Sequence, residues 1–372
     1  MPATLAFDME LIRNQFPIFQ NLPDLHFLDS ASTSQLPEIV INTMVEHEVN
    51  YRANVERGAY SLADNATRAF ESARQTVATY LNALSSREVI FTSGTTAALN
   101  MLAYCLGHQI QPGDEIILSE LEHNSNILPW RVMAEKSGAV IRYLPVTYDG
   151  RLDLTVLPLY LSNKTKIVSL THSSNVTGAI TNVKKIVTAV KNTGAIVILD
   201  GAQSAPHGPL DVQTLGIDFY VFSSHKCYGP SGVGVLWGRY ELLHQLPPYQ
   251  TGGGMISYIE PETHSYAEVP KRFEAGTPPI TQCVGLAAAL NWCMQQPWKK
   301  IHQYEQGLLS YLIKELNSRP QVHILSPVSG VDRQPLLSLN ITGIHAHDLS
   351  HILNEHHVAV RGGAHCAELL MQ

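Results

Sequence analysis

The sequence lacks an excess of basic residues. Its 372 residues contain 25 Lys and Arg against 32 Asp and Glu, which gives a formal net charge of −7. No basic run is interleaved with aromatic residues, and this excludes nucleic-acid binding of the usual kind. No apolar run reaches the length of a membrane span. The first ten residues lack the basic region and apolar core of a signal peptide, so we expect no export.

Cysteine is also scarce. The five cysteines are an odd number without paired spacing, and reduced thiols in a cytoplasmic protein are the natural interpretation. Histidine is more frequent, and one C-terminal stretch places several near Cys366: His345, His347, His351, His356, His357 and His365. Their spacings match no standard zinc pattern, so we predict no metal site.

Short β-branched runs alternate with segments of helical length through the first two thirds of the chain. The predicted strands are 89–92, 115–119, 140–144, 166–170, 195–199, 219–222 and 233–237. The predicted helices between them are 97–106, 126–136 and 183–191. This alternation predicts an α/β fold in which a mostly parallel sheet of seven strands has helices on both faces.

The last part of the chain has a different pattern. A long helical stretch over 280–294 and 301–316 precedes a strand at 335–340, a helix at 347–355 and a strand at 358–361. We therefore predict a large domain over residues 17–292. A smaller α+β domain would comprise residues 293–372 together with residues 1–16, which we expect to form a helix packed against it.

Lys226 is the most informative single residue. It follows the apolar run Phe219–Phe222 and precedes a turn that contains Gly229 and Pro230, so an amine lies at the end of a buried strand. Such a lysine can form a Schiff base with a carbonyl cofactor. Taken alone, a lysine that merely follows a strand is the more common case.

Other polar residues also follow predicted strands, where ligands bind in open parallel sheets. Thr95 and Thr96 open a helix after Gly94, which suits a phosphate. Asp200 ends a buried strand and suits a protonated ring nitrogen, and Gln203 lies one turn beyond it. Each of these residues could equally be a helix cap.

Three further residues complete the pattern. His123 follows a strand and can stack on a flat ring or move protons. Asn175 follows another strand and offers an amide, and Thr277 lies on a Gly/Pro loop that suits a phosphate. Each also has an ordinary structural explanation, so the indication comes from their order along the chain.

Together these residues resemble the class V aminotransferase family, whose members have fold type I and use pyridoxal 5'-phosphate. The resemblance runs from residue 27 to Cys366. It implies that Lys226 forms the Schiff base, His123 stacks on the ring and Asp200 pairs with the ring nitrogen. Gln203 and Asn175 would contact the ring or substrate. The phosphate would be held by Thr95, Thr96, Ser223 and His225, with Thr277 from a partner subunit. A homodimer with shared active sites follows from this.

The segment 358–367 indicates a branch of the family. Arg361 ends a strand and can bind a substrate carboxylate in a bidentate manner, and Cys366 lies five residues later on a Gly-containing loop. This loop resembles that of group II cysteine desulfurases, as do residues 122–130 and 272–278. The resemblance implies conversion of L-cysteine to L-alanine with a persulfide on Cys366, a sulfur-acceptor protein and a role in iron–sulfur cluster assembly.

Some positions depart from the family pattern. The family commonly has His at the positions of Glu56, Asn124 and Ala364. It also continues past the cysteine with a second arginine, a strand and a helix, so we expect a truncated small domain. Three alternatives stay open: a selenocysteine lyase acting on L-selenocysteine, another class V aminotransferase or lyase, and a homologue with little activity.

Overall fold

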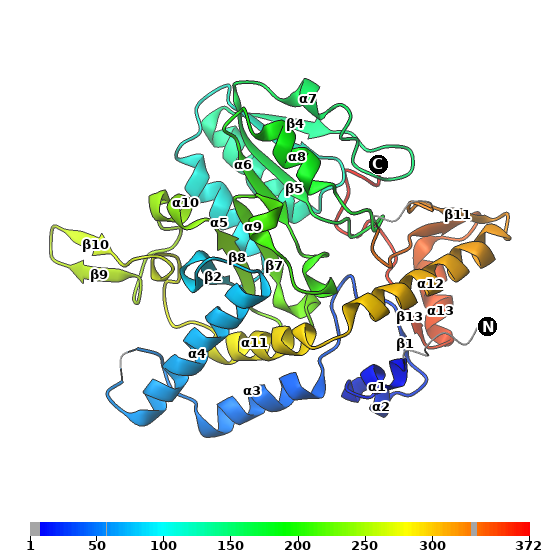
Figure 1. Cartoon of the computed structure of the whole chain (residues 1–372). Coiled ribbons are helices and arrows are strands. Elements are labelled where there is room, and N and C mark those ends of the chain that lie inside the picture. Colours follow the sequence, from blue (N-terminus) through cyan, green and yellow to red (C-terminus); the bar gives the residue numbers. More distant parts are fainter. Residues whose placement is uncertain (1–7, 57, 329–332) are drawn as a thin grey trace.

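The computed structural model describes residues 8–56, 58–328 and 333–372. Its centre is one sheet with the strand order β2-β8-β7-β6-β5-β3-β4 (Figure 1). These strands are β2 Val89–Thr92, β3 Glu115–Ser119, β4 Val140–Leu144, β5 Thr165–Thr171, β6 Ile196–Asp200, β7 Phe219–Ser223 and β8 Gly234–Gly238. All neighbours from β4 to β7 pair in parallel, and only β8 runs against the others. The predicted seven-stranded, mostly parallel sheet is confirmed.

Two apolar cores cover the two faces of this sheet. Residues of α4 Ser61–Tyr80, α8 Val183–Val190, α9 Val212–Leu215 and α11 Ile280–Met294 pack on one face. Residues of α5 Thr95–Gly107, α6 Leu128–Ser137 and α10 Tyr240–Gln245 pack on the other. The strands bury both faces, as expected for a sheet between two helical layers: in β3, Ile117 faces the first core, and Ile116 and Leu118 face the second.

The remaining elements surround this centre. The helices are α1 Met9–Arg13, α2 Pro17–Asn21, α3 Glu38–Asn50, α7 Leu157–Tyr160, α12 Trp298–Asn317 and α13 Ala346–Glu355. The short strands are β1 His26–Phe27, β9 Ile256–Ile259, β10 His264–Tyr266, β11 Val322–Ile324, β12 Leu339–Ile341 and β13 Val358–Ala359. Single 3-10 turns are η1 Ser86–Glu88, η2 Asn124–Asn126, η3 Ala205–His207, η4 Ser224–Lys226 and η5 Lys271–Phe273.

The C-terminal region is α+β, as predicted. Strand β11 pairs with β12, and β13 pairs in parallel with β1 from the N-terminal segment. The strand predicted at 335–340 is shorter and lies nearer the C-terminus: β12 covers only residues 339–341. After β13 the chain leaves this region and runs back toward the large sheet (Figure 1).

The N-terminal segment differs from the single helix that we expected. Residues 1–7 lie outside the described part of the chain, and α1 and α2 that follow are five residues each. Phe16, between them, is buried against Trp292 of α11, and the Trp292 indole donates a hydrogen bond to Gln15. Pro17 ends any longer helix, since proline is best tolerated in the first turn. The domain limits stay a prediction.

Candidate active site

The predicted site residues gather at one edge of the sheet. Strands β2, β3, β5, β6 and β7 run in the same direction, so their carboxyl ends meet there. Asp200 is the last residue of β6, and Thr95, His123, Asn175 and Lys226 each follow one of the other strands by a few residues. The parallel arrangement therefore brings together residues up to 131 positions apart in the sequence (226 − 95).

Thr95 and Ser223 form the floor of the proposed phosphate cradle. The Thr95 amide donates to Ser223 Oγ at 2.8 Å, and the two hydroxyls are also 2.8 Å apart. The turn before α5 lies directly on β8: a Cβ at Gly234 would come within 2.5 Å of Gly94 Cα. Glycine at position 234 thus lets the start of α5 sit against the sheet, where its free amides can meet an anion.

Thr96 and His225 lie at the rim of this cradle. Thr96 Oγ1 is 2.7 Å from Ser125 Oγ, which ties the start of α5 to η2. The His225 ring contacts Thr33 Oγ1 at 3.2 Å, and its backbone carbonyl accepts from Ser34. The structure thus places His225 against the N-terminal segment.

Asp200 and Lys226 interact in the buried part of the site. The Asp200 side chain is 4% exposed, and burial raises the pKa of its carboxyl although the Lys226 charge lowers it. Burial lowers the pKa of the Lys226 amine, Asp200 raises it, and Arg361 lowers it. A lysine in such surroundings releases its proton more readily and becomes a better nucleophile.

The Asp200 carboxylate has room for another partner. Among the described residues, the only hydrogen bond to its side chain comes from the Ala202 amide at 2.9 Å. A buried carboxylate is costly without a cation or several donors. A protonated ring nitrogen would supply that cation, and the cradle would take a phosphate. The residues therefore fit pyridoxal phosphate, the cofactor that the resemblance implies.

His123 is held as a neutral imidazole. Burial and the charges of Lys226 and Arg361 lower its pKa to about 4. Its Nδ1 accepts a hydrogen bond from the Ser125 amide at 3.1 Å, which leaves the proton on Nε2. A neutral ring with a fixed tautomer can stack on an aromatic group and still donate from Nε2.

The Cys366 loop closes over this edge of the sheet. The Asn175 side-chain amide donates to the His365 carbonyl at 2.8 Å, and the Asn124 backbone amide donates to the Cys366 carbonyl at 2.8 Å. An Arg361 nitrogen lies 3.6 Å from Cys366 Sγ. His365 and Cys366 both have φ of 54°, a left-handed conformation that is uncommon for residues other than glycine. Strain of this kind is often found at functional sites.

Gln203 and Thr277 are placed differently. The Gln203 side-chain amide donates to the Ala31 carbonyl at 2.7 Å, on the N-terminal segment. Thr277 is exposed and lines a separate cavity of about 160 Å³ with Asn54, Glu56 and Lys271. Within the described residues, Thr277 makes no hydrogen bond to the Lys226 cluster.

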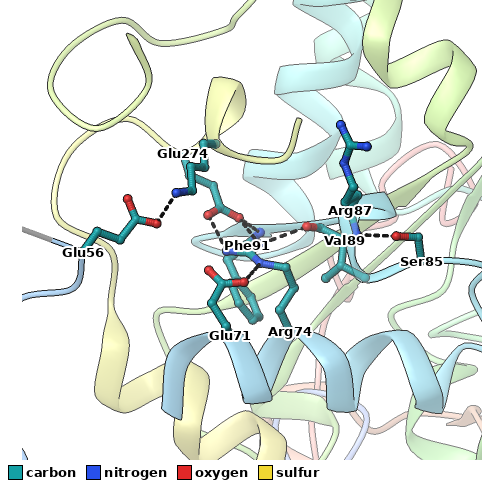
Figure 2. Close-up of polar contacts among 9 residues, drawn as sticks. Glu56, Glu71, Arg74, Ser85, Arg87, Val89, Phe91 and Glu274 are labelled. Atoms are coloured by element: carbon teal, nitrogen blue, oxygen red, sulfur yellow. Dashed lines mark hydrogen bonds and ion pairs between the residues drawn. The ribbon is translucent and has the colours of Figure 1, made fainter. Parts of the chain in front are cut away.

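A buried ion pair holds the loop that carries Thr277. Figure 2 shows Arg74 of α4 facing Glu274, with nitrogen-to-oxygen distances of 2.6 and 2.8 Å. The Arg74 side chain is 2% exposed and also donates to the Val89 carbonyl. Glu274 accepts from the Phe91 amide at 2.7 Å. The loop is thereby fixed to the first strand of the sheet.

Two acidic residues of this region were missed by sequence reasoning. Asp29 follows β1, and burial raises its pKa while Arg361, Ser32, His365 and Lys226 lower it. Glu122 is fully buried, and burial raises its pKa to about 8. It bonds to Ser119 and to Asn126, so it braces the turn that holds His123. Only its position next to His123 gave any sequence signal.

Comparison with known proteins supports the fold and the family. The family model described as Aminotransferase class-V matches residues 26–372. The chain is 42% identical to a probable cysteine desulfurase of Streptomyces coelicolor, covering 97% of this chain and 88% of that protein. It is 40% identical to a cysteine desulfurase of Pectobacterium atrosepticum, covering 99% and 91%.

Solved structures give the same result. The cysteine desulfurase CsdA from Escherichia coli superimposes with a TM-score of 0.90 at 35% identity, covering 98% of this chain and 90% of that one. The apo cysteine desulfurase of Thermococcus onnurineus gives 0.92 at 33% identity, covering 99% and 91%. A variant of the C-DES lyase, which has glycine linked to its PLP cofactor, gives 0.82 at 27% identity, covering 95% and 92%. The predicted fold is confirmed, and the chain belongs to the class V aminotransferase family.

Proposed function

We propose that this protein is a pyridoxal-phosphate-dependent cysteine desulfurase. It converts L-cysteine to L-alanine and carries the released sulfur as a persulfide on Cys366. The observation that carries the proposal is the position of the Cys366 loop: it is hydrogen-bonded to Asn124 and Asn175 at the same sheet edge as Lys226. The Cys366 thiolate is near enough to raise the pKa of the Lys226 amine. The names of the relatives support the same activity.

Lys226, Asp200 and His123 each have a separate role in the reaction. Lys226, Asp200 and the Thr95 cradle would hold pyridoxal phosphate, which would supply a carbonyl for the substrate amine and a ring able to accept electrons. Lys226 Nζ removes the α-proton, which its lowered pKa favours. Asp200 would stabilise a positive charge on the ring nitrogen, and the neutral His123 offers a proton from Nε2.

Sulfur transfer belongs to Cys366. Its thiolate attacks the substrate sulfur, a sulfur–sulfur bond forms, and the carbon–sulfur bond breaks with its electron pair on the substrate carbon. Protonation of that carbon gives alanine. Arg361 binds the substrate carboxylate in this proposal, and its distance of 3.6 Å from Cys366 Sγ supports a position beside the reacting sulfur.

Partners and location belong to the same proposal. The partly exposed Cys366 loop can transfer its sulfur to an acceptor protein that serves iron–sulfur cluster assembly.

A homodimer is supported by α3, where Ile39, Val45 and Val49 are each more than half exposed. In the part of the chain that the structure describes, no helix is long and apolar enough to cross a membrane. Free cysteines suit the reducing cytoplasm.

The test is alanine release from L-cysteine in the presence of a reductant. We expect wild type to release alanine and sulfide, and Cys366→Ala to lose nearly all of this activity while it keeps its bound cofactor. Equal rates for the two proteins would instead support a lyase that does not use Cys366. Alanine release from L-selenocysteine by Cys366→Ala would favour the selenocysteine lyase alternative.

A further inference from the structure

A second cluster of potential ligands lies away from the Lys226 site. His207 ends η3 in the large domain, and His302 and Glu305 are three residues apart on α12. One ligand atom from each lies within 4.8 Å of those from the other two. The spacing of three places both α12 side chains on the same face of that helix. The cluster therefore joins two elements that are distant in sequence.

Two of these groups are buried without a partner. His207 Nδ1 and Glu305 Oε2 are both buried and make no hydrogen bond among the described residues. Buried polar atoms are nearly always satisfied, so each such atom requires an explanation. Two unpartnered buried atoms on residues of one such cluster indicate that something is held between these side chains.

The His302 ring is also oriented to bind a ligand in this cluster. His302 Nε2 lies 3.1 Å from the His207 backbone carbonyl, so Nε2 carries the proton and Nδ1 keeps a free lone pair. A hydrogen bond of this kind from one ring nitrogen is what orients metal-binding histidines. The His302 side chain is exposed, and this gives an ion a path into the cluster.

The charges of the cluster suit a cation. Burial, together with His302, lowers the pKa of His207 to about 4, so this ring is neutral at neutral pH. Burial raises the pKa of the Glu305 carboxyl to about 7. A divalent ion would remove that penalty by pairing with the carboxylate.

We propose that His207, His302 and Glu305 bind one divalent transition-metal ion of the Zn²⁺ type. Two imidazoles and a carboxylate are a known zinc set, and a fourth position would take water. Zn–N bonds of about 2.0–2.1 Å place tetrahedral ligand atoms about 3.4 Å apart, so from separations within 4.8 Å the side chains need to close by at most about 1.4 Å. The ion would link α12 to η3. This revises the sequence prediction of no metal site, which considered only the C-terminal histidines.

The test is equilibrium dialysis of the holoenzyme against Zn²⁺, followed by metal analysis. Cys366 is alkylated first, so that its thiol does not compete. His302→Gln removes one exposed ligand, and His351→Gln is the matched control, because His351 is also an exposed helical histidine. Glu305→Gln provides a second variant from the other side of the cluster.

We expect wild type and His351→Gln to bind one Zn²⁺ per chain. Both His302→Gln and Glu305→Gln should bind it at least about tenfold more weakly, as ligand-shell changes generally do. Zn²⁺ should also raise the melting temperature of wild type more than that of His302→Gln. The proposal is overturned if wild type binds no ion, or if His302→Gln binds it as tightly as His351→Gln does. Neither outcome depends on the desulfurase activity.

Discussion

At the scale of single residues, burial sets the protonation states of the site. It keeps His123 neutral with a pKa of about 4, and it lowers the pKa of Lys226. The Asp200 carboxylate opposes this effect on Lys226 through its charge. The chain thus provides a neutral ring for stacking and an amine that gives up its proton readily.

His172 gives a prediction about pH. Burial lowers its folded pKa to about 4 from 6.5, so the unfolded chain takes up a proton first as the pH falls. The stability that this histidine contributes is complete above pH 6.5 and is lost toward pH 4. Between pH 7.5 and pH 5, wild type should lose about 2 kcal/mol more unfolding free energy than His172→Asn does. The variant keeps a polar group for Tyr220, 3.1 Å from His172 Nδ1.

Urea unfolding of both proteins at several pH values measures this difference. Parallel pH profiles for wild type and His172→Asn would contradict the assignment of a depressed pKa to His172.

Sequence reasoning located the residues that directly follow strands. Lys226, Asp200 and His123 could be found because each comes just after an apolar run, and parallel strands bring such positions together. Asp29 could not be found in this way, because its approach to Arg361 depends on the pairing of β1 with β13. No local pattern predicts a contact between two strands of two residues.

At the scale of elements, Arg74 and Glu274 connect α4 with the loop before α11. The pair is buried at both ends, with side-chain exposures of 2% and 9%. Arg74→Met should therefore lower the unfolding free energy by about 3–5 kcal/mol, since it leaves the Glu274 carboxylate buried without its cation. No local pattern predicts this pair, because 200 residues separate its members.

Arg239→Met is the matched control for this prediction. Its partner Asp218 lies 3.2 Å away, but the Arg239 side chain is 55% exposed, so the loss should stay below about 1 kcal/mol. Both variants are compared by urea unfolding at pH 7. Equal losses would show that the Arg74 pair stabilises the fold no more than an exposed pair does.

At the scale of the whole molecule, the proposed dimer shares its sites between subunits. Lys226→Ala and Thr277→Val would each inactivate or weaken both sites of their own homodimer. In a mixed dimer, one site combines an intact Lys226 with the intact Thr277 of the other subunit. When equal amounts of the two variants exchange subunits, about half of the dimers are mixed, and each mixed dimer has one of its two sites intact. The mixture should therefore recover about a quarter of the wild-type activity.

Alanine release by the mixture is compared with the sum of the two homodimers alone. Activity no greater than that sum would mean that Thr277 acts in the site of its own chain, or that the active sites are not shared between subunits.

The seven-stranded sheet was the more predictable part of the molecule. Its strands lie within one residue of the predicted limits, because alternation of buried strands and helices leaves a strong periodic pattern. The C-terminal region was less predictable, since β12 and β13 are three and two residues long and their position depends on pairing. The docking of Cys366 on Asn124 likewise comes from tertiary contacts.

The most direct measurement is mass spectrometry of the peptide that carries Cys366, taken after a single turnover with L-cysteine and without reductant. We expect this peptide to gain the mass of one sulfur atom in wild type. We expect no gain in Lys226→Ala, where the α-proton is not removed. A sulfur atom found on Cys105, Cys227, Cys283 or Cys293, or alanine formed with no sulfur on any cysteine, would contradict the account.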